Sequence, residues 1–396
     1  MPAAFVVLML ALLLGTQPVV TDLYLPALPM LTQGFGASMT QAQLTLSGLL
    51  LAFGVSQLVW GPLSDRFGRR PILLLGLGAY VLCGAAAALA GSMAWLIVWR
   101  TAQGAAMGAA VMCARAIVRD LYTPFEGARA MSRALTGIGI IACASPTAGS
   151  LIAEHFGWRT ALMVPALFGA ITLVLIALRY RETAPPAQPR SLHPQELART
   201  WARILRNPKF IAFSTLTIGT YGALFTLLAA SSFVYIQVLG LSRTVYGLLM
   251  SGTALFYITG TVICRRMLPR FGVQRTVMLA AGVSLLGGTL AAVPPLLGVQ
   301  SIWTIAPSVV LIMMAHGVHQ PCGQSGTTAP FPEAAGAASA LNGFLMMVAA
   351  FAMGGWLGAR MDGTVLPLTN GLWFWTVCIA LSAWILVRKN GDLAER

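Results

Sequence analysis

Residues 61–71 read Gly-Pro-Leu-Ser-Asp-Arg-Phe-Gly-Arg-Arg-Pro and separate two apolar runs, at 43–62 and 72–91. The stretch is densely charged, although charged residues make up only 9% of the 396-residue chain. Its triplet Arg-Phe-Gly at 66–68 recurs at 270–272, about half a chain length later. A charged turn that returns at this interval between apolar runs predicts a duplicated unit.

The composition places the protein in a membrane. The chain is 57% hydrophobic, with a mean hydropathy of +0.79, whereas soluble domains are about 45–50% apolar and about 25% charged. This excludes an ordinary soluble enzyme, and also a disordered chain, which would be polar. Runs long enough to cross about 30 Å of hydrocarbon fall near 4–30, 43–62, 72–91, 94–118, 131–153, 160–179, 210–236, 246–264, 276–297, 302–326, 338–359 and 371–388.

We therefore expect an all-α integral membrane protein with twelve transmembrane helices in two pseudo-symmetric six-helix bundles, a known transporter plan. The predicted domains are a first bundle at 1–180, a cytoplasmic linker at 181–209, a second bundle at 210–388 and a tail at 389–396. Part of the linker carries apolar residues opposite arginines, which predicts either an amphipathic helix lying on the membrane surface or a solvated linker. The apolar residues are Leu197, Trp201, Ile204 and Leu205, and the arginines are Arg199, Arg203 and Arg206.

The basic residues set the expected orientation. With the N-terminus in the cytoplasm, 20 of the 25 lysines and arginines fall in cytoplasmic segments and 3 fall on the opposite side. Because cytoplasmic loops carry the excess of Lys and Arg, we expect both termini in the cytoplasm. The same distribution explains the net charge of +14 without a nucleic-acid partner, since no basic domain or arm is present.

Asp22 is the one acidic residue well inside an apolar run. An ionisable group at the centre of a membrane costs about 2.5–3.5 kcal/mol on insertion scales and is a functional candidate by default. Helical rise places Arg100 at a similar depth, about 10 Å from the outer end of its run. We expect Asp22 and Arg100 to form the proton-coupling pair; a purely structural buried ion pair is the alternative.

Polar residues at mid-depth predict the wall of a substrate cavity. The second half has no charges that correspond to Asp22 and Arg100, so we expect a neutral, aromatic surface there. Ordinary hydrogen bonding between helices is the alternative for each of these residues. The predicted cavity residues are Gln17, Tyr24, Gln57, Tyr221, Thr226, Tyr235, Tyr257, Gln320 and Asn342.

His316, His319 and Cys322 recur every three residues in one apolar run. A metal site needs converging ligands from a further segment, so we favour polar packing or cavity lining, with a proton relay as a further alternative. We expect no metal and no cofactor. Paired catalytic motifs such as HExxH or GxSxG with a histidine do not occur, so we expect no enzyme.

The stretch at 61–71 resembles the signature loop of the major facilitator superfamily, a Gly-x-Leu-x-Asp-Arg-x-Gly-Arg-Arg pattern. We expect Gly61 to allow close helix approach and Gly68 to allow the tight turn. Asp65 can meet a helix N-terminus or an arginine and so form a latch. The predicted gating residues are Gly61, Asp65, Arg66, Gly68 and Arg69.

Two further stretches resemble motifs of the same superfamily. Arg-Thr-Ala-Gln-Gly at 100–104 is similar to its fourth-helix motif, and Ser-Pro-Thr-Ala-Gly at 145–149 is similar to its fifth-helix antiporter motif. The glycine that precedes the proline in the antiporter pattern is absent here, which weakens the inference of antiport. We expect Pro146 to kink its helix, and we assign Pro146 and Gly149 to an antiporter-type kink.

Residues 21–29, Thr-Asp-Leu-Tyr-Leu-Pro-Ala-Leu-Pro, resemble the first-helix signature of the bicyclomycin- and chloramphenicol-resistance (Bcr/CflA) drug transporters. Residues 114–120 and 331–341 also resemble that subfamily. The resemblance implies twelve transmembrane helices and proton-coupled multidrug efflux by antiport, in a bacterial cytoplasmic (inner) membrane. A carrier of the same fold that imports a nutrient by symport or facilitated diffusion is the alternative. The expected partners are protons, the lipid bilayer and a small amphiphilic substrate, and we expect a monomer.

Overall fold

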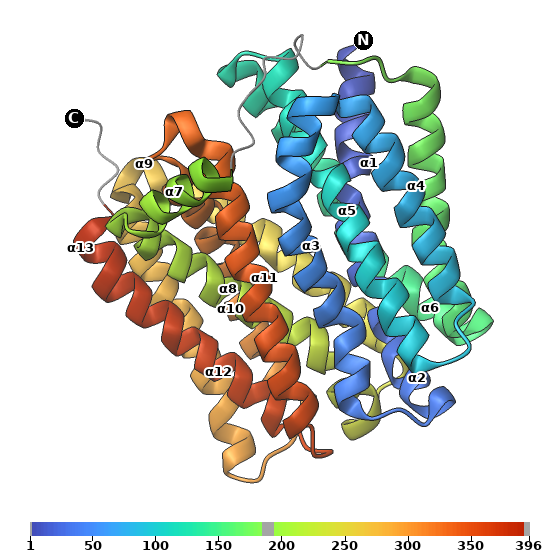
Figure 1. Ribbon diagram of the computed structural model, residues 1–396. Helices are drawn as coiled ribbons and strands as arrows, with labels where there is room; N and C mark the ends of the chain where they lie inside the picture. The colour runs from blue at the N-terminus through green and yellow to red at the C-terminus, as the bar shows by residue number, and fades with distance from the viewer. Residues whose placement is uncertain (1, 184–193, 392–396) are drawn as a thin grey trace. The chain divides into compact units, whose positions relative to one another are not determined.

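The computed structural model describes residues 2–183 and 194–391, and the regular elements in these two ranges are helices (Figure 1). Ten helical segments of this part of the chain are long and apolar enough to cross a membrane. A helix satisfies its own backbone groups, which lipid cannot do. The expected all-α membrane class is confirmed.

The first compact unit holds the described residues up to 183, together with Tyr246–Ser251. Within it, α3 packs on α5, α1 packs on α6, and α4 packs on both α5 and α6. Helix α3 begins with a capping box, in which Ser38 and Gln41 exchange hydrogen bonds between side chain and backbone. The helices of this unit are α1 (Ala3–Thr21), η1 (Leu25–Ala27), α2 (Leu28–Phe35), α3 (Met39–Phe67), α4 (Arg69–Ala88), α5 (Met93–Leu121) and α6 (Pro124–Arg179).

The second unit holds the described residues from 194 to Val245 and from Gly252 onward. Its central helix is α8, which contacts α10, α11 and α12. The helices are α7 (Pro194–Leu205), α8 (Pro208–Ser232), η2 (Phe233–Val238), α9 (Arg243–Leu296), α10 (Ile302–Thr328), η3 (Pro332–Ala334), α11 (Ala335–Arg360), α12 (Leu366–Leu381), η4 (Ser382–Val387) and α13 (Arg388–Asn390).

Elements α6 and α9 each consist of two helical arms joined at a kink. They hold 56 and 54 residues, more than twice the about 20 residues that one membrane span needs. Each contains one glycine with non-helical backbone angles, Gly157 at φ 80° and Gly272 at φ 70°. Gly272 ends the second Arg-Phe-Gly triplet, and Gly68, which ends the first, has φ 94°. The repeated triplet therefore forms a left-handed turn after an apolar helix in both units.

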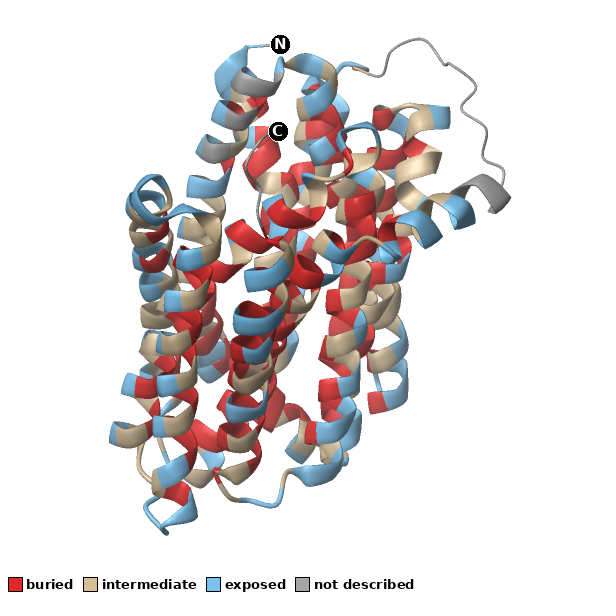
Figure 2. Cartoon of the chain, turned by 90° about the vertical axis from the view of Figure 1, so that its left-hand side faces the viewer, coloured by how far each residue is buried: buried red, intermediate tan, exposed pale blue. Residues whose placement is uncertain are grey.

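The outer faces of the helices are apolar. On α4 and its C-cap, Leu75, Leu82 and Leu89 are 60%, 72% and 74% exposed. Their spacing of seven residues places them on one stripe, and Figure 2 shows such exposed positions beside buried ones along single helices. A continuous exposed apolar stripe marks contact with lipid or a partner, in agreement with the membrane class.

Helix α7 lies within the predicted linker. Its apolar side chains Trp201 and Ile204 pack into a cluster with Phe210, Phe331 and Leu341, and Ile204 is fully buried. The apolar side chains Trp201 and Ile204 therefore dock α7 on the second unit. Leu197 falls outside the described side chains.

Candidate functional site

The first apolar run is broken at Asp22. Helix α1 ends at Thr21, and Asp22 caps it with an N–H bond of 2.8 Å to the Pro18 carbonyl. The chain then turns through η1 into α2, because Pro26 and Pro29 cannot donate the backbone bonds that would continue α1. The predicted apolar run at 4–30 lies within one membrane-capable segment, Ala3–Phe35, and Asp22 lies where that segment changes from α1 to η1. The break leaves the side chain of Asp22 half-buried.

Arg100, on α5, is fully buried against this break. Its Nη2 donates to the Val20 carbonyl at 3.0 Å, and its Nη1 donates to Oε1 of Gln103 at 3.2 Å. The guanidinium carbon also lies 4.4 Å from the centre of the Tyr24 ring, within the range of a cation–π contact. A helix ends with carbonyl groups that have no partner and a negative dipole end. Arg100 donates a hydrogen bond to one of these carbonyl groups and places its positive charge at the negative end of the α1 dipole.

The predicted ion pair between Asp22 and Arg100 is not formed. Asp22 accepts a hydrogen bond of 2.7 Å from the Thr21 hydroxyl, while the arginine binds backbone. The ion pairs found in the described residues all lie elsewhere, at Asp65 and Asp120. Counting residues matched the two depths correctly but assumed a straight helix, and the break gave the arginine a carbonyl partner instead.

Tyr24 is buried beside Arg100, and its hydroxyl is hydrogen-bonded to Thr45 of α3. Tyr24, Thr45 and Arg100 thus form one polar cluster, whereas the Asp22 carboxylate is bonded to Thr21. Sequence reasoning missed Thr45, which is one threonine among many in apolar runs. The sequence did point to Gln103, because it is the glutamine of the Arg-Thr-Ala-Gln-Gly stretch at 100–104.

Gly149 brings α6 against the same break. A Cβ at this position would overlap the carbonyl oxygen of Leu23 and would lie 2.7 Å from its carbonyl carbon. Pro146 lies one turn earlier inside α6, and its carbonyl accepts a 2.8 Å hydrogen bond from Ser150. The absence of a side chain at Gly149 therefore sets how closely α6 approaches the residue next to Asp22.

The turn between α3 and α4 holds a buried charge network. Arg69, whose side chain is 3% exposed, lies 2.6 Å from Asp65 and 2.9 Å from Asp120 of α5. Its Nη1 also donates to the Ser64 hydroxyl at 3.0 Å. A buried arginine needs charged partners and full hydrogen bonding, and here it has both. Asp120 completes the network, and only the resemblance of residues 114–120 hinted at it.

Glu182 caps the start of α4. Its two carboxylate oxygens accept the backbone N–H groups of Arg69 at 3.0 Å and Arg70 at 2.9 Å. A negative group at a helix N-terminus satisfies free donors and the helix dipole. A Cβ at position 68 would lie 2.7 Å from Oε2 of Glu182. Because Gly68 has no side chain, the Glu182 carboxylate can reach the start of α4. Sequence reasoning missed Glu182, which is more than a hundred residues away.

The remaining gating residues lie at the edge of this network. Arg66 is exposed and covers the Phe67 ring, with 5.3 Å between guanidinium carbon and ring centre. Gly61 is half-buried, and a Cβ there would lie 3.4 Å from the Cε of Met112. Asp65 has a second partner in Arg119, whose Nη2 lies 3.4 Å from Oδ1 of Asp65. The Arg119 side chain is 58% exposed. Asp65 therefore joins the buried network to the surface.

We expect Asp120→Ala to lower the free energy of unfolding by about 3 kcal/mol, because it leaves the buried Arg69 without its closest buried partner. Arg119→Gln is the matched control, since its pair with Asp65 is exposed and contributes under about 1 kcal/mol. Thermal unfolding of both variants in detergent measures the difference. Equal losses in the two variants would show that the network does not stabilise the turn.

In the second unit, two of the predicted cavity residues, Asn342 and Tyr257, contact polar side chains of other helices. Asn342 of α11 accepts a 2.8 Å bond from the Thr217 hydroxyl of α8. His316 of α10 is bonded to Thr220 at 2.8 Å, and its ring centre lies 5.3 Å from that of Tyr257. These bonds link helices through neutral groups.

The other predicted cavity residues have separate positions. Tyr221, Thr226 and Tyr235 are buried in α8 and η2, and Gln320 is half-buried in α10. The Thr226 hydroxyl donates a hydrogen bond of 2.7 Å to the Gly222 carbonyl of its own helix. In the first unit, Gln17 is half-buried on α1 and Gln57 is buried on α3. The structure thus brings together only part of the predicted set.

The stripe on α10 separates into two environments. His319 is fully buried, and neither ring nitrogen has a hydrogen-bond partner in the described residues. The sulfur of Cys322 instead lies 3.6 Å from that of Cys264 on α9. No group of three metal-ligating side chains is found within the ranges the structure describes.

Comparison with known proteins decides the family. Residues 8–355 match the model of the Major Facilitator Superfamily. The chain belongs to this superfamily. It is therefore a multi-pass membrane transporter and not an enzyme, as expected from its sequence.

The relatives and the fold agree with this assignment. Multidrug resistance protein D of Escherichia coli is 30% identical over 344 residues, which cover 86% of this chain and 85% of the relative. The bicyclomycin resistance protein homolog of Haemophilus influenzae is 24% identical over 97% of this chain and 96% of the relative. The resemblance to the drug-resistance subfamily is thereby confirmed. A crystal structure of a POT family transporter superposes with a TM-score of 0.78 at 15% identity, covering 100% of this chain and 97% of that one, and so shares the fold.

Proposed function

We propose that this transporter exports small amphiphilic organic compounds in exchange for protons, by alternating access. Two lines of support combine. Similar proteins are named for multidrug and bicyclomycin resistance, and the chain places one carboxylate, Asp22, at a break in a membrane helix. Asp22 carries the proposal, because an intramembrane acid without an ion-pair partner among the described residues can gain and lose a proton.

The proposed topology has twelve membrane spans. Dividing α6 at Gly157 and α9 at Gly272 turns the ten long apolar segments into twelve, six on each side of the linker. The proposed domains are the bundles at 1–180 and 210–388, with the linker and the tail in the cytoplasm. The excess of arginine in the predicted cytoplasmic loops supports cytoplasmic termini, and the bacterial relatives support the inner membrane.

In the proposed cycle, Asp22 takes up a proton when the transporter is open to the outside. It releases that proton when the transporter is open to the cytoplasm. A neutral Asp22 holds a cationic substrate less tightly, so protonation promotes substrate release outside. Arg100 acts as a positioning residue, because its bonds to Val20 and Gln103 hold the end of α1. This role replaces the ion pair expected from the sequence.

The charged turn at Asp65 and Arg69 serves in this proposal as a latch. Its buried part is fixed by Asp120 and Glu182, and its exposed part is the weak pair with Arg119. Weak exposed pairs break and form readily, as a gate must. The neutral groups around Asn342 and Tyr257 in the second unit suit contact with an uncharged or singly charged aromatic substrate over a multivalent anion. We propose a monomer without cofactor or metal.

A growth test in cells and a transport test in proteoliposomes together test the proposal. A drug-sensitive, efflux-deficient bacterial host that expresses the chain should grow at higher concentrations of some toxic cations than the same host without it. In proteoliposomes, a proton gradient should then drive the protective compound against its concentration gradient, in the direction opposite to proton flow. Movement in the same direction as protons would instead establish the symport alternative.

A further inference from the structure

Helix α7 holds its arginines in place on the second unit. Because Trp201 and Ile204 are packed into the cluster with Phe210 and Phe331, the helix cannot rotate its polar face inward. Arg199, Arg203 and Arg206 are exposed on that polar face. A rigid helix with three exposed arginines is a preorganised basic surface, unlike a flexible linker that carries the same charge.

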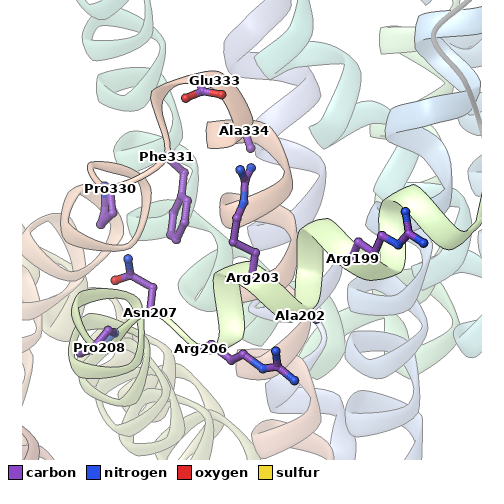
Figure 3. A pocket seen from close by; sticks show the side chains of 10 residues that line it. All are labelled: Arg199, Ala202, Arg203, Arg206, Asn207, Pro208, Pro330, Phe331, Glu333 and Ala334. Atoms are coloured by element: carbon purple, nitrogen blue, oxygen red, sulfur yellow. The ribbon is translucent and has the colours of Figure 1, made fainter.

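These arginines line a cavity of about 660 Å³, within the size range of small-ligand sites. Figure 3 shows Arg203 extending from α7 toward the segment with Glu333 and Ala334, while Arg199 and Arg206 extend away from that segment. Three arginines thus line a cavity with a single acidic residue, Glu333. The ion pairs found in the described part of the chain do not include these arginines.

The remaining wall shows which groups can bind an anion. Oδ1 of Asn207 accepts the N–H groups of Lys209 at 2.9 Å and Phe210 at 3.1 Å, so the start of α8 is already capped. The guanidinium groups are left as the donors, and their planar fork matches a phosphate. Phe331, at 8% exposure, supplies an apolar wall of the cavity. Leu205 of α7 does not line the cavity, but it precedes Arg206 in the chain and is 44% exposed.

We propose that this cavity binds the phosphodiester headgroup of an anionic phospholipid, with phosphatidylglycerol as the test case. A phospholipid combines the negative phosphate that the arginines require with the apolar chains that Leu205 and Phe331 can contact. The inference rests on the proposed topology for one point only, that the lipid lies in the cytoplasmic leaflet. That leaflet attracts basic segments close to a membrane by about 1 kcal/mol per arginine, or about fivefold in affinity.

Native mass spectrometry of the full chain in neutral detergent tests the site. Short-chain phosphatidylglycerol should bind with a dissociation constant that rises about fivefold in Arg203→Gln. It should rise over a hundredfold, to the level of non-specific binding, in the triple variant Arg199→Gln/Arg203→Gln/Arg206→Gln. Ala202→Phe, which fills the cavity and retains the arginines, should also weaken binding.

The matched control is Arg265→Gln/Arg266→Gln, which removes two exposed charges from α9 outside the cavity and should leave the dissociation constant unchanged. Phosphatidylcholine of the same chain length should bind weakly. The proposal is overturned if phosphatidylcholine or inorganic phosphate binds as tightly as phosphatidylglycerol, or if the control variant loses as much affinity as the triple variant. Binding is measured without transport, so its failure is distinct from a failure of the proposed function.

Discussion

Asp22→Asn is expected to reduce uphill drug export to the level of protein-free liposomes while the protein still inserts and folds. The substitution keeps the size and one hydrogen-bond acceptor for the Thr21 hydroxyl, but it removes the group that can carry a proton. It also removes the insertion penalty of a charge, about 2.5–3.5 kcal/mol, so thermal stability should be equal or higher. Proteoliposome transport under an imposed pH gradient, at matched protein amounts, measures the effect.

Two further variants sharpen this test. Asp362→Asn removes an exposed acid from the segment between α11 and α12 and should transport at the wild-type rate. Asp22→Glu keeps a titratable group, displaced by one methylene, and should retain part of the activity. Wild-type uphill transport by Asp22→Asn would place the coupling proton elsewhere and would refute the proposed role of the first helix.

Gly149→Ala should both destabilise the protein and impair transport more than tenfold. The new methyl group overlaps the Leu23 carbonyl, which is backbone and cannot rotate away. Overpacking of this kind typically costs about 1–3 kcal/mol, and here the forced shift separates α6 from the residue beside Asp22. Thermal unfolding and gradient-driven transport should therefore both decline.

Gly78→Ala is the matched control, because a Cβ at this position of α4 meets no other atom within 4 Å. That variant should be as stable as the wild type or slightly more so, since alanine favours a helix over glycine. If Gly149→Ala and Gly78→Ala unfold at the same temperature and transport equally well, close packing at Leu23 does not position the site.

Local sequence patterns were sufficient to predict the membrane class, one turn and the intramembrane acid. The apolar runs predicted the membrane class, because a span must be long and apolar whatever it packs against. The charged stretch at 61–71 predicted the turn at Gly68, and the second triplet predicted a duplicated unit; Gly272 has the same positive φ, which glycine adopts readily. Asp22 was evident as a charge where lipid makes charges expensive.

Partners distant in sequence were beyond the reach of these patterns. Arg69 lies between Asp65, which is four residues away, and Asp120, which is on another helix. Helical periodicity identifies the face on which a residue lies, but it does not give the neighbouring helix or its register. The cap that Glu182 provides for α4 was missed for the same reason.

The sequence by itself determined the membrane class, the repeated turn, the charge asymmetry and the one intramembrane acid, because each depends on composition or on a few adjacent residues. Only the tertiary structure decided that Arg100 binds the Val20 carbonyl, that Ile204 docks α7 on the second unit, and that Gly149 touches Leu23. Each of these contacts depends on how closely two helices approach. That distance depends on the side chains of both helices together, and neither segment specifies it alone.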